Sequence, residues 1–470
     1  MTDLADWTAT ELAAAYARGA ASPVEATRAV LDRIADRDTA LNAFCLVDGE
    51  AAIEQAARSE ARWQAGTPAG PLDGVPVSIK DLFLTRGWPT LRGSRTIDPD
   101  QEWDEDAPAV ARLRESGAVL IGKTTTPELG WKGVTDGPLT GVTRNPWDPS
   151  RTSGGSSGGA AAAVAAGMGP LATGTDGGGS IRIPAGFCGI VGFKPTYGRV
   201  PLYPASPFGT LAHAGPMARS VEDAALMLDV LSRPDPRDWS ALDPPTASFR
   251  DRLDGGVGAG LRGLRIAFSP DLGHVDVDPG IAGPVRAAVE VLAGLGAVVE
   301  EVTPGFPDPV RAYHVLWFSG AAKSLERLSP AQWEQVDPGL AEVAEEGRTM
   351  SALDYLDAVA ERMALGSRMG RFHTRFDLLV TPTLPIPAFT AGREVPTSWP
   401  SPRWTSWTPF SYPFNLTQQP AVSVPCGVTG GGLPVGLQIV GPRHADARVL
   451  AAAKAYQDAT TWVDRRPPPS

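Results

Sequence analysis

The positions of hydrophobic and polar residues predict helices and strands that succeed one another along most of the chain. Near the start, the capping-box patterns TATE and SPVE each precede apolar residues at helical spacing. Short apolar runs predict buried strands. In chain order, we expect helices over about 9–18, 23–36, 48–65, 107–116, 158–166 and 280–294, and strands over about 74–81, 118–123, 170–176, 264–270 and 297–302. This succession favours an α/β fold.

Two stretches depart from this pattern. Residues 133–159 are dense in glycine and proline, which predicts loop through most of the segment. Between about 303 and 410 the sequence is rich in aromatic residues without a clear period, and we expect irregular structure there. Late strands are expected at about 378–385, 421–427 and 434–441. No internal repeat or linker divides the chain.

Composition narrows the class of protein. The chain has 470 residues, of which 43% are hydrophobic, so it can bury a large core. Its net charge is −11 and no run of Lys or Arg could neutralise several phosphates, which argues against nucleic acid as a partner. It has no basic-then-apolar leader and no apolar run of about 18 residues, so we expect a soluble cytoplasmic protein with no membrane contact. The three scattered cysteines predict neither a disulfide framework nor a zinc site.

Two segments rich in glycine and serine are the main candidates for chemistry, TSGGSSGG over 152–159 and GTDGGGSIR over 174–182. Glycine at this density indicates that the backbone turns sharply or approaches another group closely. Flexible linkers are disfavoured because structure-forming sequence flanks both segments. Neither segment has the phosphate-binding pattern G-x-x-x-x-G-K-[ST] or the dinucleotide pattern G-x-G-x-x-G, and Lys194 has the wrong spacing for the first.

The nucleophile elbow of an α/β-hydrolase stays open as an interpretation. Both GGSSG and GSSGG satisfy its pattern G-x-S-x-G, which requires a preceding strand. The preceding residues RNPWDPS contain two prolines, which disfavour that strand. Five histidines are available as the base of such a triad, at positions 213, 274, 314, 373 and 444.

A different interpretation makes Ser180 the nucleophile, at the start of a helix where the backbone amides of the glycine triplet can point at one oxygen. Such amides form an oxyanion hole for a tetrahedral intermediate. A serine hydroxyl needs a base, and Lys80 can serve as that base if burial keeps its amine neutral. Ser156 would pass the proton between the two.

These residues resemble the hallmark of the amidase signature family, a G-G-S-S-G-G run followed by G-[ST]-D-x-G-G-S-[IV]-R. The segments GVPVSIKD, GAVLIGKTTTPELG, GIVGFKPTYGRV, VTPTLPIP, NLTQQP and PVGLQIVG also resemble family segments in the expected order. The resemblance implies that Ser180 forms the acyl-enzyme, Ser156 bridges and Lys80 is the base. The family's bridging serine lies 24 residues before the nucleophile, and 180 − 156 = 24 selects Ser156 over Ser157.

The resemblance also assigns the oxyanion hole to the backbone amides of Gly177, Gly178, Gly179 and Ser180. Ser157, Asp176 and Arg182 match family positions that support the catalytic residues. The resemblance implies that Asp176 and Arg182 hold the loop in shape. Gly177 departs from the family pattern, because many relatives carry a larger residue there. The departure would leave the loop looser or the acyl pocket wider.

For the fold, the resemblance implies one amidase signature domain over 1–464, an α/β/α sandwich around a mixed central sheet. The family motifs lie in a core at about 70–230, and late strands lie within 376–441. The region at about 235–375 would differ among family members and shape the substrate pocket. The tail at 465–470 is expected to be disordered. The resemblance implies no metal and no organic cofactor, and family habit suggests a homodimer.

The implied function is hydrolysis of the C–N bond of a carboxylic amide through a Ser-Ser-Lys triad and an acyl-enzyme. The substrate would be a small-molecule amide, such as an aryl or fatty amide, with ureas and carbamates (urethanes) as related classes. Trp131, Gly133 and Thr135 are candidates for the pocket wall. Two alternatives stay open: the glutaminase component of a glutamyl-tRNA amidotransferase, which shares these motifs, and a non-catalytic binding protein on the same fold.

Overall fold

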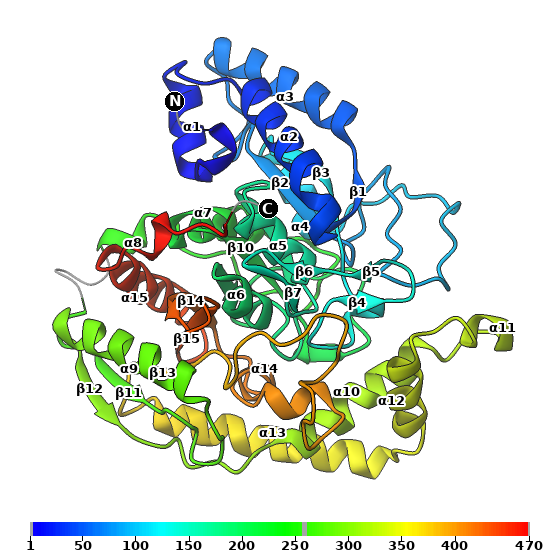
Figure 1. The fold of residues 1–470 in the computed structure, drawn as a ribbon, viewed down its shortest axis with the longest axis vertical. Coiled ribbons are helices and arrows are strands. Elements are labelled where there is room, and N and C mark those ends of the chain that lie inside the picture. Colours follow the sequence, from blue (N-terminus) through cyan, green and yellow to red (C-terminus); the bar gives the residue numbers. More distant parts are fainter. Residues whose placement is uncertain (1–2, 256–260, 469–470) are drawn as a thin grey trace.

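The computed structural model describes residues 3–255 and 261–468 (Figure 1). A mixed sheet of 11 strands runs through these residues in the order β1-β3-β2-β8-β10-β9-β14-β15-β13-β11-β12. β2 pairs in parallel with β3 and β8, and β11 with β12 and β13, whereas the other neighbours run antiparallel. The strands are β1 (Phe44–Val47), β2 (Pro76–Lys80), β3 (Val119–Thr124), β8 (Leu171–Asp176), β9 (Val191–Lys194), β10 (His213–Ala218), β11 (Arg265–Phe268), β12 (Val298–Glu301), β13 (Leu378–Pro382), β14 (Ala421–Val428) and β15 (Pro434–Val440).

Helices cover both faces of this sheet. Successive strand residues point to opposite faces, so Leu171 and Ala172 of β8 belong to two different hydrophobic clusters. The cluster around Ala172 includes α5 (Gly158–Ala165) and α6 (Arg182–Cys188). The cluster around Leu171 includes α4 (Pro108–Glu115), α7 (Val221–Leu231), α9 (Pro279–Gly294) and α15 (Asp446–Asp458). The predicted α/β fold with a mixed central sheet is confirmed.

Both capping boxes form at the start of the chain. Thr8 caps α1 (Ala9–Ala17) and Ser22 caps α2 (Pro23–Leu41), and in each case the side chain accepts a hydrogen bond from the amide of the glutamate three residues on. α2 extends beyond its expected end and stops at Asn42, which adopts the left-handed conformation. With α3 (Gly49–Gln64), these helices form the blue upper part of Figure 1.

The region between 303 and 410 contains long helices, so the expectation of irregular structure there is wrong. α10 (Val310–Ser324) packs against both α12 (Pro338–Arg348) and α13 (Ala352–Phe372), which lie along the lower edge of Figure 1. α10 is buried over most of its surface, including Trp317 and Phe318. It therefore has no broad polar face to give the sequence a helical period.

The remaining elements are short. Within the glycine-rich stretch, β4 (Asp136–Gly137) pairs with β5 (Gly141–Val142), and β6 (Arg144–Asn145) pairs with β7 (Asp148–Thr152), so the segment is less irregular than expected. Short helices are α8 (Arg252–Gly255), α11 (Pro330–Trp333) and α14 (Pro413–Leu416).

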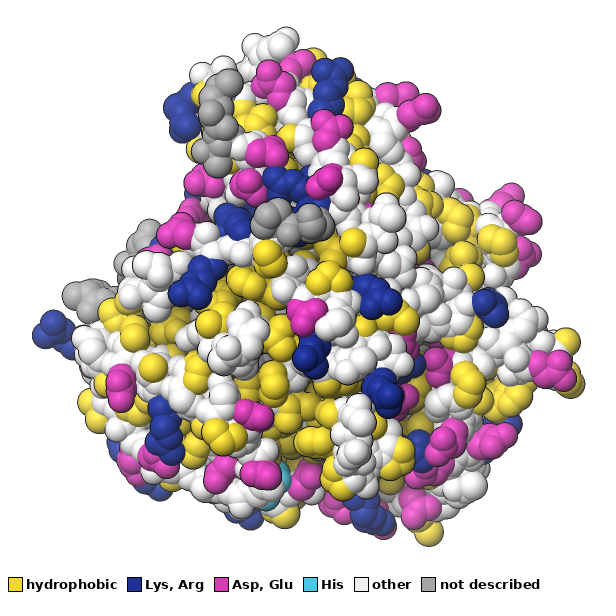
Figure 2. All heavy atoms as spheres, viewed as in Figure 1, with side chains coloured by type: hydrophobic (Ala, Val, Ile, Leu, Met, Phe, Trp, Pro, Cys, Tyr) yellow, Lys and Arg dark blue, Asp and Glu magenta, His cyan; other side chains and the backbone are white. Residues whose placement is uncertain are grey.

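The C-terminal tail is partly described. Arg37 Nη2 donates a hydrogen bond of 2.8 Å to the Pro468 carbonyl, which ties this end to α2. The rest of the tail that we expect to be disordered, residues 469–470, lies outside the described residues. Among the helices of the described ranges, none is long and apolar enough to cross a membrane. On the face seen in Figure 2, acidic and basic side chains are interspersed.

Candidate active site

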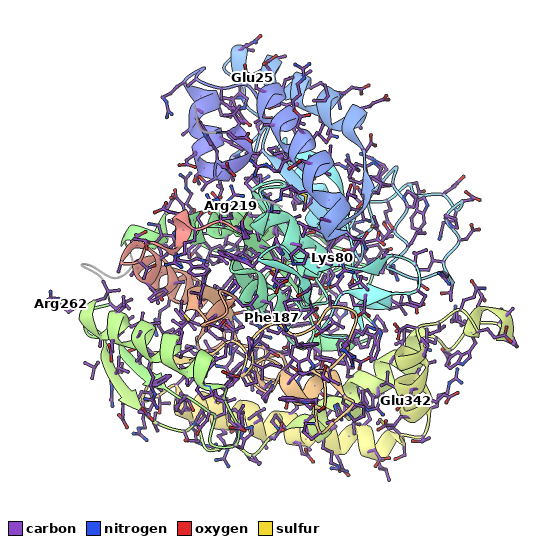
Figure 3. All side chains as sticks on the ribbon, viewed as in Figure 1. Glu25, Lys80, Phe187, Arg219, Arg262 and Glu342 are labelled. Carbon is purple, nitrogen blue, oxygen red and sulfur yellow. The ribbon has the colours of Figure 1, made fainter. Side chains whose placement is uncertain are left out.

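Two parallel strands, β2 and β8, end side by side inside the molecule. Val77 of β2 pairs with Leu171 of β8, and the strands end at Lys80 and Asp176. Figure 3 shows Lys80 well within the fold, beside the sheet. The carboxyl ends of the strands of an α/β sheet are where such folds usually place their functional groups.

The Lys80 side chain is 0% exposed and is surrounded by hydroxyl groups. Its Nζ lies 2.7 Å from Ser156 Oγ, 2.9 Å from Ser157 Oγ and 2.8 Å from Thr175 Oγ1. Burial lowers the pKa of Lys80 well below its ordinary value, and the negative charge of Asp176 opposes this only in part. The amine is therefore neutral at pH values where an exposed lysine is protonated.

The serine pair 156 and 157 lies just before α5 in a tightly packed backbone. Gly154 has a φ of +75°, in the left-handed region that favours glycine. A Cβ atom on Gly155 would lie 2.4 Å from the carbonyl group of Val134. The glycines of GGSSGG are thus required by the close approach of neighbouring backbone, which brings Ser156 beside Lys80.

The carboxylate of Asp176 organises the loop that follows β8. Its Oδ1 accepts a hydrogen bond of 2.7 Å from the Gly179 amide. In this structure that amide is therefore not available to bind a substrate oxygen. Among the described residues, the amides of Gly177, Gly178 and Ser180 have no hydrogen-bond acceptor. Three of the four amides that the resemblance assigns to an oxyanion hole are thus free to bind an oxygen.

Asp176 is held in turn by a buried network. Arg182 donates from Nε and from Nη2 to the two carboxylate oxygens, at 2.9 Å each, and Asn415 Nδ2 donates to Oδ1 at 2.8 Å. Burial alone would raise the pKa of Asp176, but the charge and hydrogen bonds of Arg182 outweigh it and hold that pKa well below its ordinary range. The loop is therefore built around an ionised carboxylate with fully buried partners.

Replacing Arg182 with methionine is expected to lower the free energy of unfolding by about 3–5 kcal/mol, because Asp176 would stay buried without its partner. Arg286→Met is the matched control, since the ion pair of Arg286 with Glu301 is exposed and contributes at most about 1 kcal/mol. Denaturant-induced unfolding of both variants measures the difference. Equal losses in the two variants would contradict a stabilising role for the Asp176 network.

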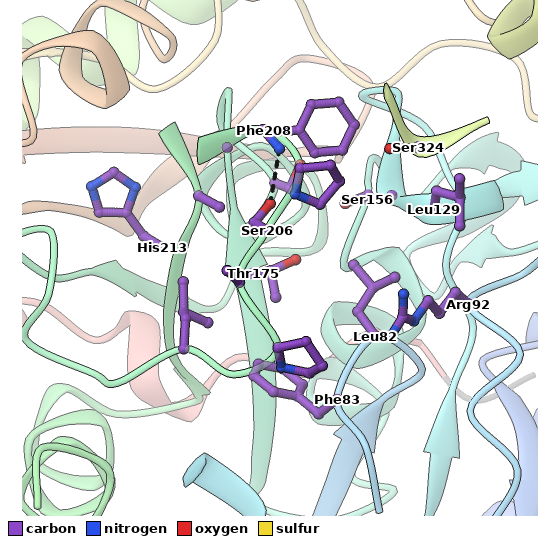
Figure 4. A pocket seen from close by; sticks show the side chains of 18 of the residues that line it. Leu82, Phe83, Arg92, Leu129, Ser156, Thr175, Ser206, Phe208, His213 and Ser324 are labelled. Atoms are coloured by element: carbon purple, nitrogen blue, oxygen red, sulfur yellow. Dashed lines mark hydrogen bonds between the residues drawn. The ribbon is translucent and has the colours of Figure 1, made fainter. Parts of the chain in front are cut away.

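A cavity of about 210 Å³ lies beside these groups (Figure 4). Ser156 and Ser180 both line it, together with Thr175 and Gly177. The rest of its wall is mostly apolar and includes Leu82, Phe83, Leu129, Phe208, Ala212 and Trp317. The ring of Phe208 stacks on that of Trp317 with centroids 3.8 Å apart. A substrate carbonyl placed at Ser180 would thus enter a largely hydrophobic chamber.

Trp131, Gly133 and Thr135, which we expect in the pocket wall, are not among the residues that line this cavity. The Trp131 carbonyl accepts a hydrogen bond of 3.0 Å from Trp317 Nε1, so it supports a residue that does line the cavity. Gly133 packs against the rings of two other tryptophans. Thr135 Oγ1 accepts a hydrogen bond of 3.0 Å from the Gly158 amide at the start of α5.

A segment that the sequence does not single out contributes a large part of the wall. Residues 202–208 all line the cavity and begin two residues after the family segment that ends at 200. The segment has neither helical nor strand periodicity, so nothing in its pattern shows that it faces a cavity. Trp317 is one of many aromatics in its region, and the sequence does not distinguish it from the others.

Trp317 also explains the unusual glycine at 177. A Cβ atom on Gly177 would lie 2.6 Å from the Trp317 ring. The tryptophan therefore occupies the room that a larger residue at 177 would take. The cavity is therefore not wider at Gly177, although this residue has no side chain.

Comparisons with known proteins agree with the sequence motifs. The sequence model of the family described as Amidase matches residues 25–450. An acylamidase from Rhodococcus erythropolis is 38% identical over 470 residues, covering 98% of this chain and 96% of that protein. The A subunit of the glutamyl-tRNA(Gln) amidotransferase of Chloroflexus aurantiacus is 37% identical, covering 99% of each chain. A solved bacterial aryl acylamidase of the amidase signature family superposes with a TM-score of 0.90, at 32% identity and over 97% of both chains.

Proposed function

The chain belongs to the amidase signature family and is an amide-hydrolysing enzyme, and we propose that it cleaves small-molecule amides through Ser180, Ser156 and Lys80. Ser180 is the nucleophile, Ser156 relays protons and Lys80 is the base. The observation that carries this proposal is the buried Lys80 amine, which lies 2.7 Å from Ser156 Oγ, together with the cavity that Ser156 and Ser180 both line.

The hydrogen bonds around Lys80 support a direction for the proton relay. Ser157 Oγ donates to the Thr175 carbonyl at 3.2 Å, so it accepts a hydrogen from Lys80. Thr175 Oγ1 can accept the second hydrogen of a neutral amine. The lone pair of the nitrogen is then left for the Ser156 hydroxyl. Ser156 and Ser180 line the same cavity, and in the proposed relay Ser156 Oγ takes the proton of Ser180.

Catalysis follows from this relay in two steps. Ser180 Oγ attacks the amide carbonyl while its proton passes through Ser156 to Lys80, and the free amides of Gly177 and Gly178 stabilise the oxyanion. The proton returns through Ser156 to the leaving amine as the C–N bond breaks, which leaves Ser180 acylated. Water then attacks the acyl-enzyme while its proton passes through Ser156 to Lys80, and the proton returns through Ser156 to Ser180 Oγ as the acid is released.

The described part of the cavity wall offers no carboxylate partner for the α-ammonium group of free glutamine. Glutamine carries an α-ammonium group that needs a carboxylate partner, and none of the described residues that line the cavity is Asp or Glu. The apolar wall instead suits an aryl or alkyl group. Trp317 and Ser324, which line the cavity, belong to the region 235–375, and this supports the assignment of that region to the substrate pocket.

A substrate panel tests the proposed class. The purified enzyme is assayed with chromogenic anilides of short and long acyl chains, an aryl carbamate, an aryl ester and glutamine. We expect turnover of anilides with apolar acyl groups and much slower release of ammonia from glutamine. Turnover of glutamine alone would overturn the proposal in favour of the amidotransferase alternative.

Activity is expected to rise with pH and then reach a plateau. The base must be neutral, and burial places the pKa of Lys80 well below the ordinary lysine value, so the amine gains its proton and activity falls only as the pH drops through that lowered pKa. The measurement is kcat/KM for an uncharged anilide between about pH 5 and 10. An activity that decreases over the neutral range as the pH is raised would contradict Lys80 as the base.

A further inference from the structure

Arg92 stands out in the wall of the cavity because of its charge. Among the described lining residues it is the one Lys, Arg, Asp or Glu. His213 also lines the cavity, but burial lowers its pKa well below the ordinary value, so its ring is neutral. Figure 4 shows the Arg92 side chain beside Leu129, extending toward Leu82. One fixed positive charge thus faces a chamber whose other described lining side chains are uncharged.

The guanidinium group of Arg92 has no partner in the part of the chain that the structure describes. The hydrogen bonds and ion pairs among residues 3–255 and 261–468 include none from its side-chain nitrogens. Asp81 is near enough for its charge to act on Arg92, but its carboxylate forms an ion pair with Lys123 at 3.2 Å. Burial lowers the pKa of Arg92, which reflects the cost of holding this cation partly away from water.

The backbone at Arg92 is fixed in a conformation that few side chains adopt. Its φ is +55°, in the left-handed region where a bulky residue is uncommon. Its carbonyl accepts a hydrogen bond of 2.7 Å from the Leu129 amide, and the next amide, that of Gly93, donates to Asp81 Oδ2 at 3.3 Å. These contacts hold the arginine between the segment after Lys80 and the segment that carries Leu129. A strained, anchored position of this kind points to a role for the side chain.

We propose that Arg92 binds a carboxylate on the substrate, so that the preferred substrates are amides with an anionic group separated from the scissile bond by an apolar segment. The inference rests on the proposed function and specifies its substrate class. The planar guanidinium matches a carboxylate with two parallel hydrogen bonds, and a partly buried site strengthens such a pair. The apolar side chains of Leu82 and Leu129 would contact the intervening carbons.

Two series of matched amides test this assignment. In the first, 4-nitroanilides carry an acyl chain of fixed length that ends in either a carboxylate or a methyl group. In the second, the charge is on the leaving amine, and N-acyl-4-aminobenzoate is compared with N-acyl-4-toluidine. The readout is the ratio of kcat/KM for the charged and the neutral member of each pair. The series that responds tells whether the carboxylate lies on the acyl or on the amine side.

We expect the wild type to favour the carboxylate in one series, and Arg92→Gln to lower that ratio by about 10- to 100-fold. Arg92→Lys should give an intermediate ratio, because it keeps the charge without the planar fork. Arg95→Gln is the matched control: Arg95 is exposed on the same loop, and its loss changes the net charge equally. The control should keep the wild-type ratio.

Two results would overturn the proposal: a wild type with no preference for the carboxylate in either series, or an unchanged ratio in Arg92→Gln. If Arg92→Gln does not fold, inhibition of the wild type by the free products decides: either dicarboxylates must bind at least about tenfold more tightly than monocarboxylates of equal length, or 4-aminobenzoate must bind more tightly than 4-toluidine by that factor. The amide-hydrolase proposal would fail differently, by an absence of turnover for every amide in both series.

Discussion

Replacing Ser180 with alanine is expected to reduce kcat for anilide hydrolysis by about ten-thousandfold or more. The alanine cannot form the acyl-enzyme, so the residual rate would come only from the oxyanion site and from positioning of a water molecule. Steady-state kinetics on the anilide that the wild type cleaves best measures the loss. Thermal unfolding should stay close to that of the wild type, since the described residues offer no hydrogen-bond partner to Ser180 Oγ.

Ser324→Ala is the matched control for this variant. Ser324 also lines the cavity, but its Oγ donates to the Gly320 carbonyl at 2.8 Å within α10. Its loss should change kcat by less than about tenfold, because no proton transfer depends on it. A Ser180→Ala enzyme that keeps a tenth or more of the wild-type rate would exclude Ser180 as the nucleophile.

Replacing Lys80 with methionine is expected to lower kcat by about a thousandfold or more, because methionine fills a similar volume but cannot accept the proton that Ser156 relays. The pH dependence distinguishes this loss from a packing defect. Residual activity in the variant should no longer fall as the pH drops through the lowered pKa of Lys80. A variant with reduced activity but the wild-type pH profile would show that another group is the base.

Local signals in the sequence predicted much of the fold. The capping boxes at Thr8 and Ser22 depend on residues three positions apart, so the sequence alone shows where α1 and α2 begin. The short apolar runs that end at Lys80 and Asp176 are strands buried along nearly their whole length, and they form β2 and β8. Their order in the sheet does not follow from these runs, since it depends on pairings between distant segments.

The helices between 303 and 410 could not be predicted from the sequence, and the reasons are physical. α10 packs on several sides, with Tyr313, Leu316 and Trp317 all buried, so polar and apolar positions do not alternate with the turn of a helix. α13 leaves Leu353, Leu356 and Met363 exposed, which blurs its apolar face in a different way. In both cases tertiary packing, and not a local pattern, determines which residues are buried.

The candidate site was predictable in its residue types but not in its geometry. The family resemblance singled out Lys80, Ser156 and Ser180, whose catalytic roles stay predictions. The contact of Lys80 with Thr175 joins residues 95 positions apart, and the sequence has no signal for it. The hydrogen bond from the Gly179 amide to Asp176 could not be predicted from the sequence either, because it depends on how the loop folds around that carboxylate.

Locating the acyl group on the enzyme tests most directly whether Ser180 is the nucleophile. The protein is treated with a fluorophosphonate or a slowly released carbamate, digested with trypsin and analysed by tandem mass spectrometry. Trypsin leaves Ser156, Ser157 and Ser180 on one peptide, residues 152–182, so fragmentation within that peptide must assign the adduct. We expect a single adduct on Ser180, and no adduct in the Ser180→Ala variant. An adduct on Ser156 or Ser157 in the wild type would contradict this expectation.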